Sequence, residues 1–296
     1  MLPFIPISRG LPAPRAWMVV EPRGFAQHLG EALSIHVYPQ SVFCDRRVFY
    51  FIARRGIEKL LGLACQPGEH RGVMRDFRGQ THLIDVFEVK IGPADHANAR
   101  ALRKHLPFTR PALVGIETSI GCGDRLGLAT PGHIRAVRGT GVKPYFAQQS
   151  IREMTRTQRT ADEVMDAATY GVLQEGWREG FGSDADHLKT AEDVDVTVAA
   201  GFTMFTIDPG AHVDNAADSD SSGALAQKFE SLPWVDLEDT AADCRGRYLG
   251  KRFHMADGLA LELSDERLQR AAAKYGRAVA HTARLYRHLA TRMGRK

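Results

Sequence analysis

The sequence is poor in the features that mark specialised classes of protein. It has only four cysteines in 296 residues, and they share no spacing typical of metal ligands. We interpret them as reduced thiols of a cytoplasmic protein rather than as disulfides. The longest apolar runs fall far short of the roughly 18 residues that span a bilayer. The proline- and arginine-rich start also lacks the apolar core of a signal peptide, so we expect a cytoplasmic protein with no membrane partner.

An excess of charge of one sign is also missing. The chain has 39 lysines and arginines against 35 acidic residues, a net charge of +4, and its basic residues are scattered along the sequence. Because nucleic-acid binding requires clustered basic residues, no nucleic-acid partner is expected. The glycine-rich segment 121–127 matches neither the G-x-G-x-x-G pattern nor the P-loop, and no G-x-S-x-G motif occurs. We therefore expect no nucleotide cofactor and no nucleophilic serine of the hydrolase type.

What the sequence does have is an ordinary globular composition, with 44% apolar and 25% charged residues. Residues 33–92 alternate apolar and polar side chains over short segments separated by turn residues. This texture is typical of strands and hairpins. We predict a β-rich N-terminal part over residues 1–95, with its first 25 residues loosely held, and a second part over residues 96–296.

The second part alternates strand and helix signals. Helices are predicted to start at the capping residues Thr160, Thr190 and Ser264, the first of which has a Glu three positions later, as in a capping box. Short β-branched or aromatic runs predict four strands, Ala112–Glu117, Val142–Ala147, Phe181–Ala185 and Phe202–Ile207.

Strands separated by helices imply right-handed crossovers and a parallel sheet. We therefore predict an α/β protein with a (β/α) TIM-barrel-like fold and a small β-rich N-terminal part. Four strands are half of an eight-stranded barrel, so the barrel is expected to be incomplete. Because open sheet edges are costly in water, we expect pairing with a second copy or closure over the N-terminal part.

The last predicted helix carries an apolar stripe at helical spacing, formed by Leu268, Ala272, Tyr275, Val279, Thr282 and Tyr286. Two histidines on this helix, His281 and His288, are interpreted as packing or solvated positions rather than as ligands.

In a barrel of this type the catalytic groups project from the carboxyl ends of the strands. The densest of these ends here is the run Ser183–His187, which contains Asp184, Asp186 and His187. A neutral imidazole is the commonest metal ligand, and an adjacent carboxylate orients it or acts as a base. The alternative is an Asx-turn followed by the N-cap of the helix at Thr190.

For other polar residues, the sequence allows both a role in binding or catalysis and a purely structural role. For Asp208 and His212, on either side of a Pro-Gly turn, a turn-forming or packing role is the preferred interpretation. Gln148 and Gln149 suit the recognition of sugar hydroxyls and helix capping equally. In the glycine-rich segment, Arg125 is a candidate partner for an anion.

Four long segments also make the sequence recognisable, namely SIGCGDRLGLATPGHI, KPYFAQQSIREMTRT, GFGSDADHLKT and FTMFTIDPGAHVD. They closely resemble the tagaturonate epimerase (tagaturonate/fructuronate epimerase) family, densely from Leu113 to Asp214 and more loosely elsewhere. The resemblance implies a metal-dependent isomerase of cytosolic hexuronate catabolism that interconverts D-tagaturonate and D-fructuronate. Its partner would be a small keto-sugar acid.

The resemblance also implies roles for two residues. Asp186 matches the proton acceptor of the family, and His187 matches a ligand of a divalent metal cation whose identity stays open. Because the two keto acids differ at a carbinol carbon β to the ketone, we expect retro-aldol cleavage and re-addition rather than simple deprotonation. No role is carried over to four residues that are plausible in a pocket, Asp124, Gln149, Asp208 and His212.

Members of the family are longer, and the resemblance assigns their acidic proton donor and remaining metal ligands to strands beyond the helix that ends near His288. We therefore expect this chain to lack the C-terminal part of the family fold and to meet it as a separate fragment, or to form a homo-oligomer. Two alternatives to an epimerase stay open. One is an inactive remnant that binds a sugar acid, and the other is a metal-dependent aldolase acting on a related keto acid.

Overall fold

The computed structural model describes residues 21–294. Most of the segment predicted to be loosely held lies outside this range, but its last residues belong to a helix, α1, that begins at Pro22. The chain forms two compact units. Unit 1 comprises residues 1–185 and 200–204, and unit 2 comprises residues 186–199 and 205–296.

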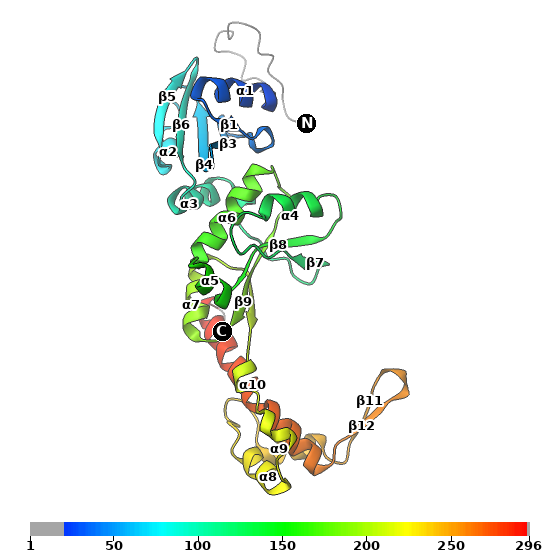
Figure 1. The fold of residues 1–296 in the computed structure, drawn as a ribbon. Helices are drawn as coiled ribbons and strands as arrows, with labels where there is room; N and C mark the ends of the chain where they lie inside the picture. The colour runs from blue at the N-terminus through cyan, green and yellow to red at the C-terminus, as the bar shows by residue number, and fades with distance from the viewer. Residues whose placement is uncertain (1–20, 295–296) are drawn as a thin grey trace. The chain divides into compact units, whose positions relative to one another are not determined.

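Unit 1 holds the N-terminal elements (Figure 1). Its helices are α1 Pro22–Leu33, α2 Arg71–Asp76, α3 His96–His105, α4 Thr130–Val137, α5 Ile151–Thr157 and α6 Ala161–Gln174. Its strands are β1 His36–Val37, β2 Phe43–Asp45, β3 Val48–Arg55, β4 Glu58–Cys65, β5 Gln80–Ile84, β6 Phe87–Pro93, β7 Ser119–Gly121 and β8 Lys143–Ser150, followed by the first part of β9 Gly182–Leu188.

Six of these strands form an antiparallel sheet in the order β1-β3-β4-β6-β5, with β2 paired to β3. The strand texture predicted for residues 33–92 is thus confirmed. Helix α1 covers one face of the sheet, where Phe25 packs against Phe51 (Figure 1). Leu102 of α3 belongs to the core on the other face, together with Leu63 of β4. The sheet is therefore buried on both sides.

A second sheet has four strands in the order β10-β9-β8-β7, where β10 is Met204–Ile207. Strands β7 and β8 pair in parallel. The N–H group of Thr203 donates to the carbonyl of Ser183. Five residues further along both segments, just past the end of β10, the N–H group of Asp208 donates to the carbonyl of Leu188. Because the offset stays constant, β9 and β10 are parallel as well.

The protein therefore has the mixed α/β fold that the sequence predicts. Four parallel strands are compatible with part of a barrel, and the TIM-barrel assignment stays a prediction. The antiparallel sheet ends at Pro93, close to the boundary predicted near residue 95. The two compact units divide the chain elsewhere, so the division into residues 1–95 and 96–296 also stays a prediction.

The predicted strand Ala112–Glu117 is wrong. These residues are irregular, and the first strand of the parallel sheet begins only at Ser119. The chain turns at Gly115, whose φ is +68°, which interrupts any extended run. Leu113 and Ile116 are 73% and 105% exposed, so the apolar run does not contribute to the core. Glu117 and Thr118 therefore lie before strand β7 and not at the end of a strand.

The other three predicted strands are confirmed, with shifted ends. Strand β8 continues through the two glutamines to Ser150, and β9 continues through the Asp-His pair to Leu188. The three predicted helix starts are confirmed too. The hydroxyl groups of Thr160, Thr190 and Ser264 each accept a backbone N–H three residues ahead.

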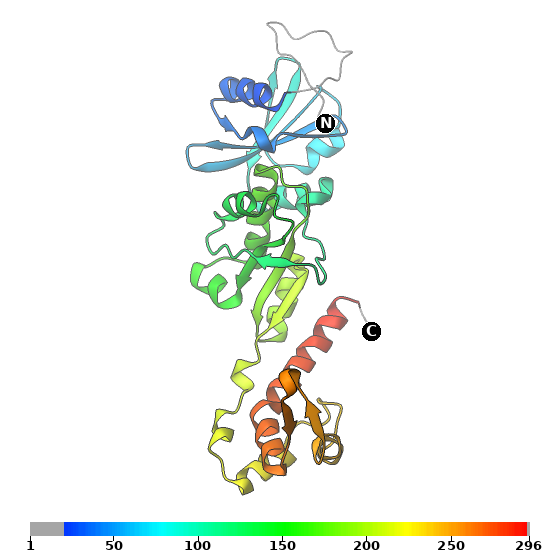
Figure 2. The same ribbon diagram turned by 90° about the vertical axis from the view of Figure 1, so that its right-hand side faces the viewer.

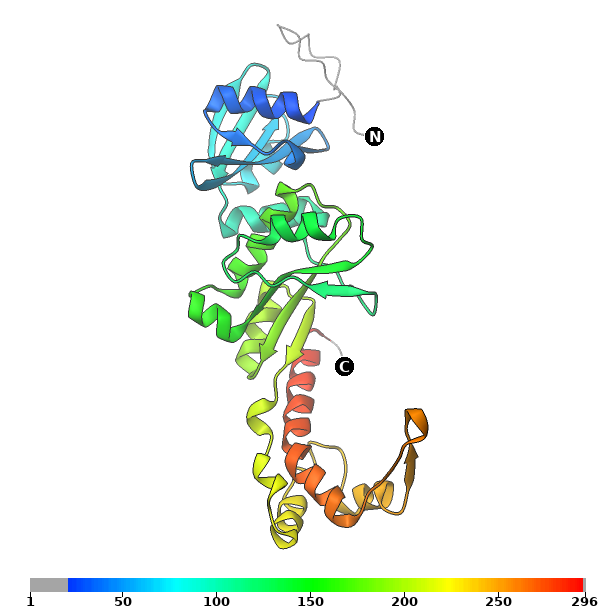
Figure 3. The ribbon, with the colours of Figure 1, turned by 45° about the vertical axis from the view of Figure 1, so that its right-hand side comes forward.

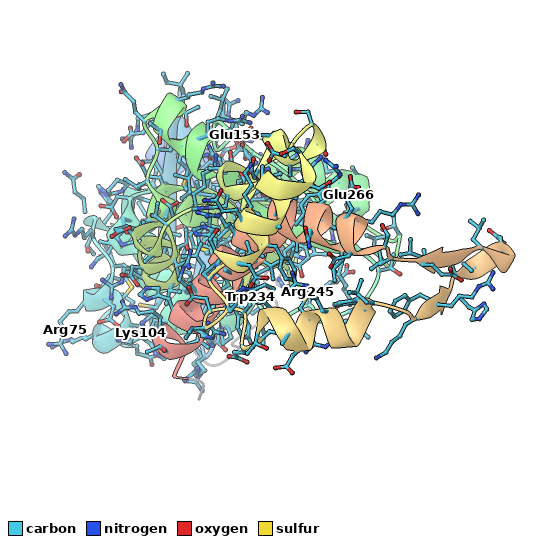
Figure 4. All side chains as sticks on the ribbon, turned by 90° about the horizontal axis from the view of Figure 1, so that it is seen from below. Arg75, Lys104, Glu153, Trp234, Arg245 and Glu266 are labelled. Atoms are coloured by element: carbon cyan, nitrogen blue, oxygen red, sulfur yellow. The ribbon has the colours of Figure 1, made fainter. Side chains whose placement is uncertain are left out.

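Unit 2 contains most of helix α7 Ala191–Ala200 and of strand β10, together with the helices α8 Ser222–Glu230, α9 Ala241–Tyr248 and α10 Asp265–Arg292. It also holds a hairpin of β11 Arg252–His254 and β12 Ala260–Glu262 (Figures 2 and 3). A small core surrounds Phe229, whose ring lies 5.1 Å from that of Trp234 and 4.5 Å from the guanidinium of Arg245; both neighbours are labelled in Figure 4. Within residues 21–294, every helix is too short or too polar to cross a membrane.

The antiparallel sheet yields a stability prediction at Gly62. This residue lies directly opposite Phe51 in the β3–β4 ladder, and a Cβ there would overlap the Phe51 ring. We expect Gly62→Ala to lower the free energy of unfolding by about 1–3 kcal/mol, because the fully buried ring has no free space to move into.

The matched control is Gly72→Ala in α2, where an added Cβ meets no atom within 4 Å. Helix propensity then favours a gain of up to about 1 kcal/mol. Denaturant unfolding of both variants checks the prediction. An unchanged midpoint for Gly62→Ala would contradict it.

Candidate functional site

The end of β9 brings Asp186 and His187 together. In a regular strand, neighbouring side chains point to opposite faces of the sheet. His187, however, has a left-handed backbone conformation with a φ of +59°. Its Nδ1 atom lies 2.6 Å from Oδ1 of Asp186. The left-handed residue thus turns two normally opposed side chains into a hydrogen-bonded pair.

This pair is accessible from outside. The side chains of Asp186 and His187 are 22% and 55% exposed. Because Nδ1 faces the carboxylate, Nε2 is the ring nitrogen that remains to meet a ligand. The alternative interpretation, a helix cap, is right for Thr190, which forms reciprocal hydrogen bonds with Asp193 at the start of α7. Asp186 and His187 are not members of that cap.

Asp208 directly follows strand β10, and its charge interacts with that of His187. Oδ1 of Asp208 accepts the N–H of Gly210 at 2.9 Å, and Oδ2 lies 3.3 Å from Nζ of Lys189. The hydrogen bond from Gly210, followed by Lys189 and His187, holds the pKa of Asp208 below its usual value. Asp208 therefore starts the predicted turn and also faces a cation.

Two further imidazoles lie in the same unit. The ring of His212, after β10, stacks on that of His281 in α10, with centroids 3.9 Å apart and planes 25° apart. Burial, followed by the charges of His212 and Arg284, lowers the pKa of His281, while a hydrogen bond with the backbone of Lys189 opposes the shift. This stack fastens the turn after β10 to the last helix and agrees with a packing role for His212.

The second histidine of α10 has a partner as well. Nε2 of His288 lies 2.8 Å from Oδ1 of Asp195, and Nε of Arg292 lies 2.9 Å from the same oxygen. These contacts join α10 to α7. The sequence predicts only packing or solvated positions for His281 and His288. It does not reveal their partners, because nothing in it pairs residues so far apart.

Asp184, the other acidic residue of the run, belongs to unit 1 and is only 4% exposed. Nε2 of Gln148 donates to Oδ2 of Asp184 at 3.0 Å. The amide of Gln148 lies against Gly121, where a Cβ would overlap it. Gly121 thereby makes room for an amide–carboxylate pair that joins β8 to β9. No signal in the sequence pairs these two residues, which stand 36 positions apart.

Asp124 has a structural role. Its buried carboxylate accepts the backbone N–H groups of Leu128, Ala129 and Thr130 at 3.0, 2.8 and 3.2 Å, where α4 begins. Burial alone would raise the pKa of Asp124, but these hydrogen bonds outweigh burial and lower it. The residue therefore holds the glycine-rich loop on the start of the helix.

Gln149 and Arg125 are also engaged within the protein. Oε1 of Gln149 accepts a hydrogen bond from Arg159 at 2.7 Å. Arg125 pairs with Glu153 at 2.5 Å, and Glu153 forms a capping box with Ser150 at the start of α5. The residue that caps α5 is therefore Ser150, next to the two glutamines, while Gln149 belongs to a buried network. The anion partner of Arg125 is a carboxylate of the chain itself.

The donor set fits a metal ion only in part. Among residues 21–294, no three His, Cys, Asp or Glu side chains are grouped closely enough to hold one. The Asp186–His187 pair is nevertheless the arrangement in which a carboxylate orients an imidazole toward a metal at Nε2. One imidazole does not complete a coordination shell. His187 therefore suits one ligand position of a divalent-cation site, and the other ligands of such a site are not grouped around it within residues 21–294.

The backbone of His187 generates a prediction. His187→Gly and His187→Ala both remove the imidazole, but only glycine adopts a positive φ without steric cost. We expect His187→Gly to be more stable than His187→Ala by about 1 kcal/mol. Denaturant unfolding at neutral pH measures the difference. Equal stability, or a more stable alanine variant, would show that the strand is regular at this position.

Asp124 generates a prediction about pH. Because its pKa in the folded protein lies below the ordinary 3.8, its stabilising effect is complete above pH 3.8 and is lost as the pH falls through the lowered pKa. We expect Asp124→Asn to lower the free energy of unfolding by about 1–3 kcal/mol at neutral pH. The gap to the unmodified protein should narrow below about pH 4. Urea titrations between pH 7 and 3 test this, with Asp257→Asn as an exposed control.

Comparison with known proteins agrees with this description. Residues 38–296 match a family model described as tagaturonate epimerase. The tagaturonate/fructuronate epimerase of Thermotoga maritima is 43% identical over 265 residues, which are 90% of this chain and 52% of that protein. Crystal structures of the fructuronate-tagaturonate epimerase UxaE from Cohnella laeviribosi, one complexed with glycerol and one native, have TM-scores of 0.78 and 0.77.

These two structures are 34% and 33% identical to this chain, and the match covers 92% of this chain and 54% of theirs. The chain thus spans about half the length of the relatives it matches. Since the family match extends over most of the sequence, this chain belongs to the tagaturonate epimerase family.

Proposed function

We propose that this protein acts as a tagaturonate/fructuronate epimerase in cytoplasmic hexuronate breakdown, with Asp186 as the proton acceptor. One observation carries the proposal, namely the accessible Asp186–His187 pair at the end of β9 in a chain of this family. The Lys189–Asp208 pair adds an exposed cation in the same unit. In the TIM-barrel-like fold proposed for the chain, strand ends of this kind line the active site.

The chemistry follows from the substrate. The two keto acids differ at a carbinol carbon β to the ketone, so enolisation does not acidify its C–H bond. A base removes the hydroxyl proton of that carbon, the C–O bond becomes an aldehyde carbonyl, and the adjacent C–C bond breaks. Its electron pair passes to the ketone as an enediolate. After the aldehyde rotates, the enediolate adds to its other face and the alkoxide regains a proton, so atoms and electrons balance.

The residues of unit 2 suit these steps. Asp186 is accessible and is oriented by His187, as a general base must be. The ammonium group of Lys189, whose side chain is 57% exposed, suits the carboxylate of a sugar acid. A divalent cation with His187 as one ligand would stabilise negative charge on the substrate oxygens.

A first experiment tests the proton acceptor. The purified protein is incubated with D-tagaturonate and a panel of divalent salts, and D-fructuronate is followed by NMR. We expect Asp186→Asn to lower kcat by about 100-fold or more with bound metal retained. Asp236→Asn, which removes a carboxylate paired with Arg284 at the protein surface, is the matched control and should leave kcat unchanged.

Three outcomes would contradict the proposal. Release of three-carbon fragments would identify an aldolase, and binding of D-tagaturonate without conversion would identify an inactive remnant. Loss of metal from Asp186→Asn would make that residue a ligand instead of a base. The retro-aldol route has its own test, since deuterium on the inverting C–H should stay in the product. Exchange of that deuterium with solvent would exclude the route.

A further inference from the structure

Helix α10 presents an apolar face that nothing in its own unit covers. Tyr275, Val279 and Tyr286 are 50%, 56% and 64% exposed, and Met293 is 46% exposed. The buried side of the helix lies elsewhere, at residues such as Ala278 and Leu285. Large apolar side chains gathered on one exposed face mark an interaction surface, whereas single exposed ones do not.

The spacing of this face is regular. From Leu268 onward, apolar or small side chains recur at alternating intervals of four and three residues through Leu268, Ala272, Tyr275, Val279, Thr282, Tyr286, Leu289 and Met293. This alternation gives a straight stripe that another element packs against along the helix axis. Its first residue, Leu268, is already buried against α8 and α9, and the later part of the stripe continues outward from that core.

Unit 1 exposes a comparable surface of its own. Strand β7 is the edge of the parallel sheet, and all three of its residues are exposed. Ile120 of β7 is 49% exposed, and Leu113, Leu126 and Leu128, in the segments on either side of β7 in the sequence, are 70% to 75% exposed. An open strand edge with apolar neighbours is a site for further pairing. Each unit therefore carries a surface of the kind that another part of a fold usually covers.

We infer that the α10 stripe, defined as Tyr275, Val279, Thr282, Tyr286 and Met293, is the docking surface for the part of the family fold that this chain does not match. The structure of the Cohnella enzyme superimposes on this chain with a TM-score of 0.78, but the match covers only 54% of the length of that enzyme. The remainder of that enzyme is almost as long as the part that matches.

The occupant is therefore a polypeptide segment with an apolar face, corresponding to the unmatched part of the relatives. A second copy of this chain would cover the stripe with another α10, but it would leave the length of the relatives unexplained. The inference holds whether the segment is joined to this chain or separate from it, and it does not depend on the identity of the proton acceptor.

Thiol labelling tests the inference. Among the described residues, Cys44 is the exposed native cysteine and Cys65, Cys122 and Cys244 are buried. In a Cys44→Ser background, Val279→Cys puts a thiol on the stripe and Ile57→Cys puts one in the fully exposed β3–β4 turn. Maleimide labelling is measured for the chain alone, with the unmatched part of the Thermotoga maritima relative added, and with that part fused behind residue 296.

We expect labelling of the Val279→Cys thiol to slow at least tenfold in the mixture or the fusion, with the Ile57→Cys rate unchanged. Adding Tyr275→Ser and Tyr286→Ser should abolish this protection while circular dichroism keeps its helical signal. Unchanged labelling in both the mixture and the fusion overturns the inference. So does protection in the chain alone that disappears on dilution, because it would identify a second copy as the occupant.

Discussion

A left-handed residue inside a strand sets the direction of the chemical groups in this protein. With regular backbone angles at His187, its imidazole and the carboxylate of Asp186 would project from opposite faces of the sheet. The φ of +59° places them 2.6 Å apart instead. Sparsely populated backbone angles persist only where surrounding structure enforces them. Here the enforcing parts are the buried neighbours Ala185 and Leu188 and the parallel partner β10.

The polar residues at the strand ends fall into two groups. Asp124, Gln149 and Ser150 are buried and fully engaged in loops, networks and caps, so they build the scaffold. Asp186 and His187 are partly exposed and bonded to each other, which leaves them available for a substrate. A polar residue close to a strand end can thus belong to the scaffold or stay open to solvent, and its hydrogen-bond partners distinguish the two cases.

Local interactions made much of the fold predictable from sequence. The helix starts at Thr160, Thr190 and Ser264 are predictable because a capping hydroxyl accepts a backbone N–H only three residues ahead. The false strand at Ala112–Glu117 arose because an apolar run does not reveal whether a partner strand exists. Long-range pairs such as Gln148 with Asp184 were out of reach for the same reason. The contact between Asp186 and His187, by contrast, can be foreseen because the two residues are adjacent in sequence.

Two glycines allow three of the segments that resemble the family, those containing β7, β8 and β9, to pack closely against one another. Gly121 of β7 leaves space for Gln148 of β8, and Gly182 of β9 leaves space for the ring of Tyr145, also of β8. Two side chains of β8 thus occupy space that the missing Cβ atoms of β7 and β9 leave free. A larger residue in place of Gly121 or Gly182 would require a smaller residue in place of Gln148 or Tyr145. Substitutions in these three segments are therefore expected to be coupled.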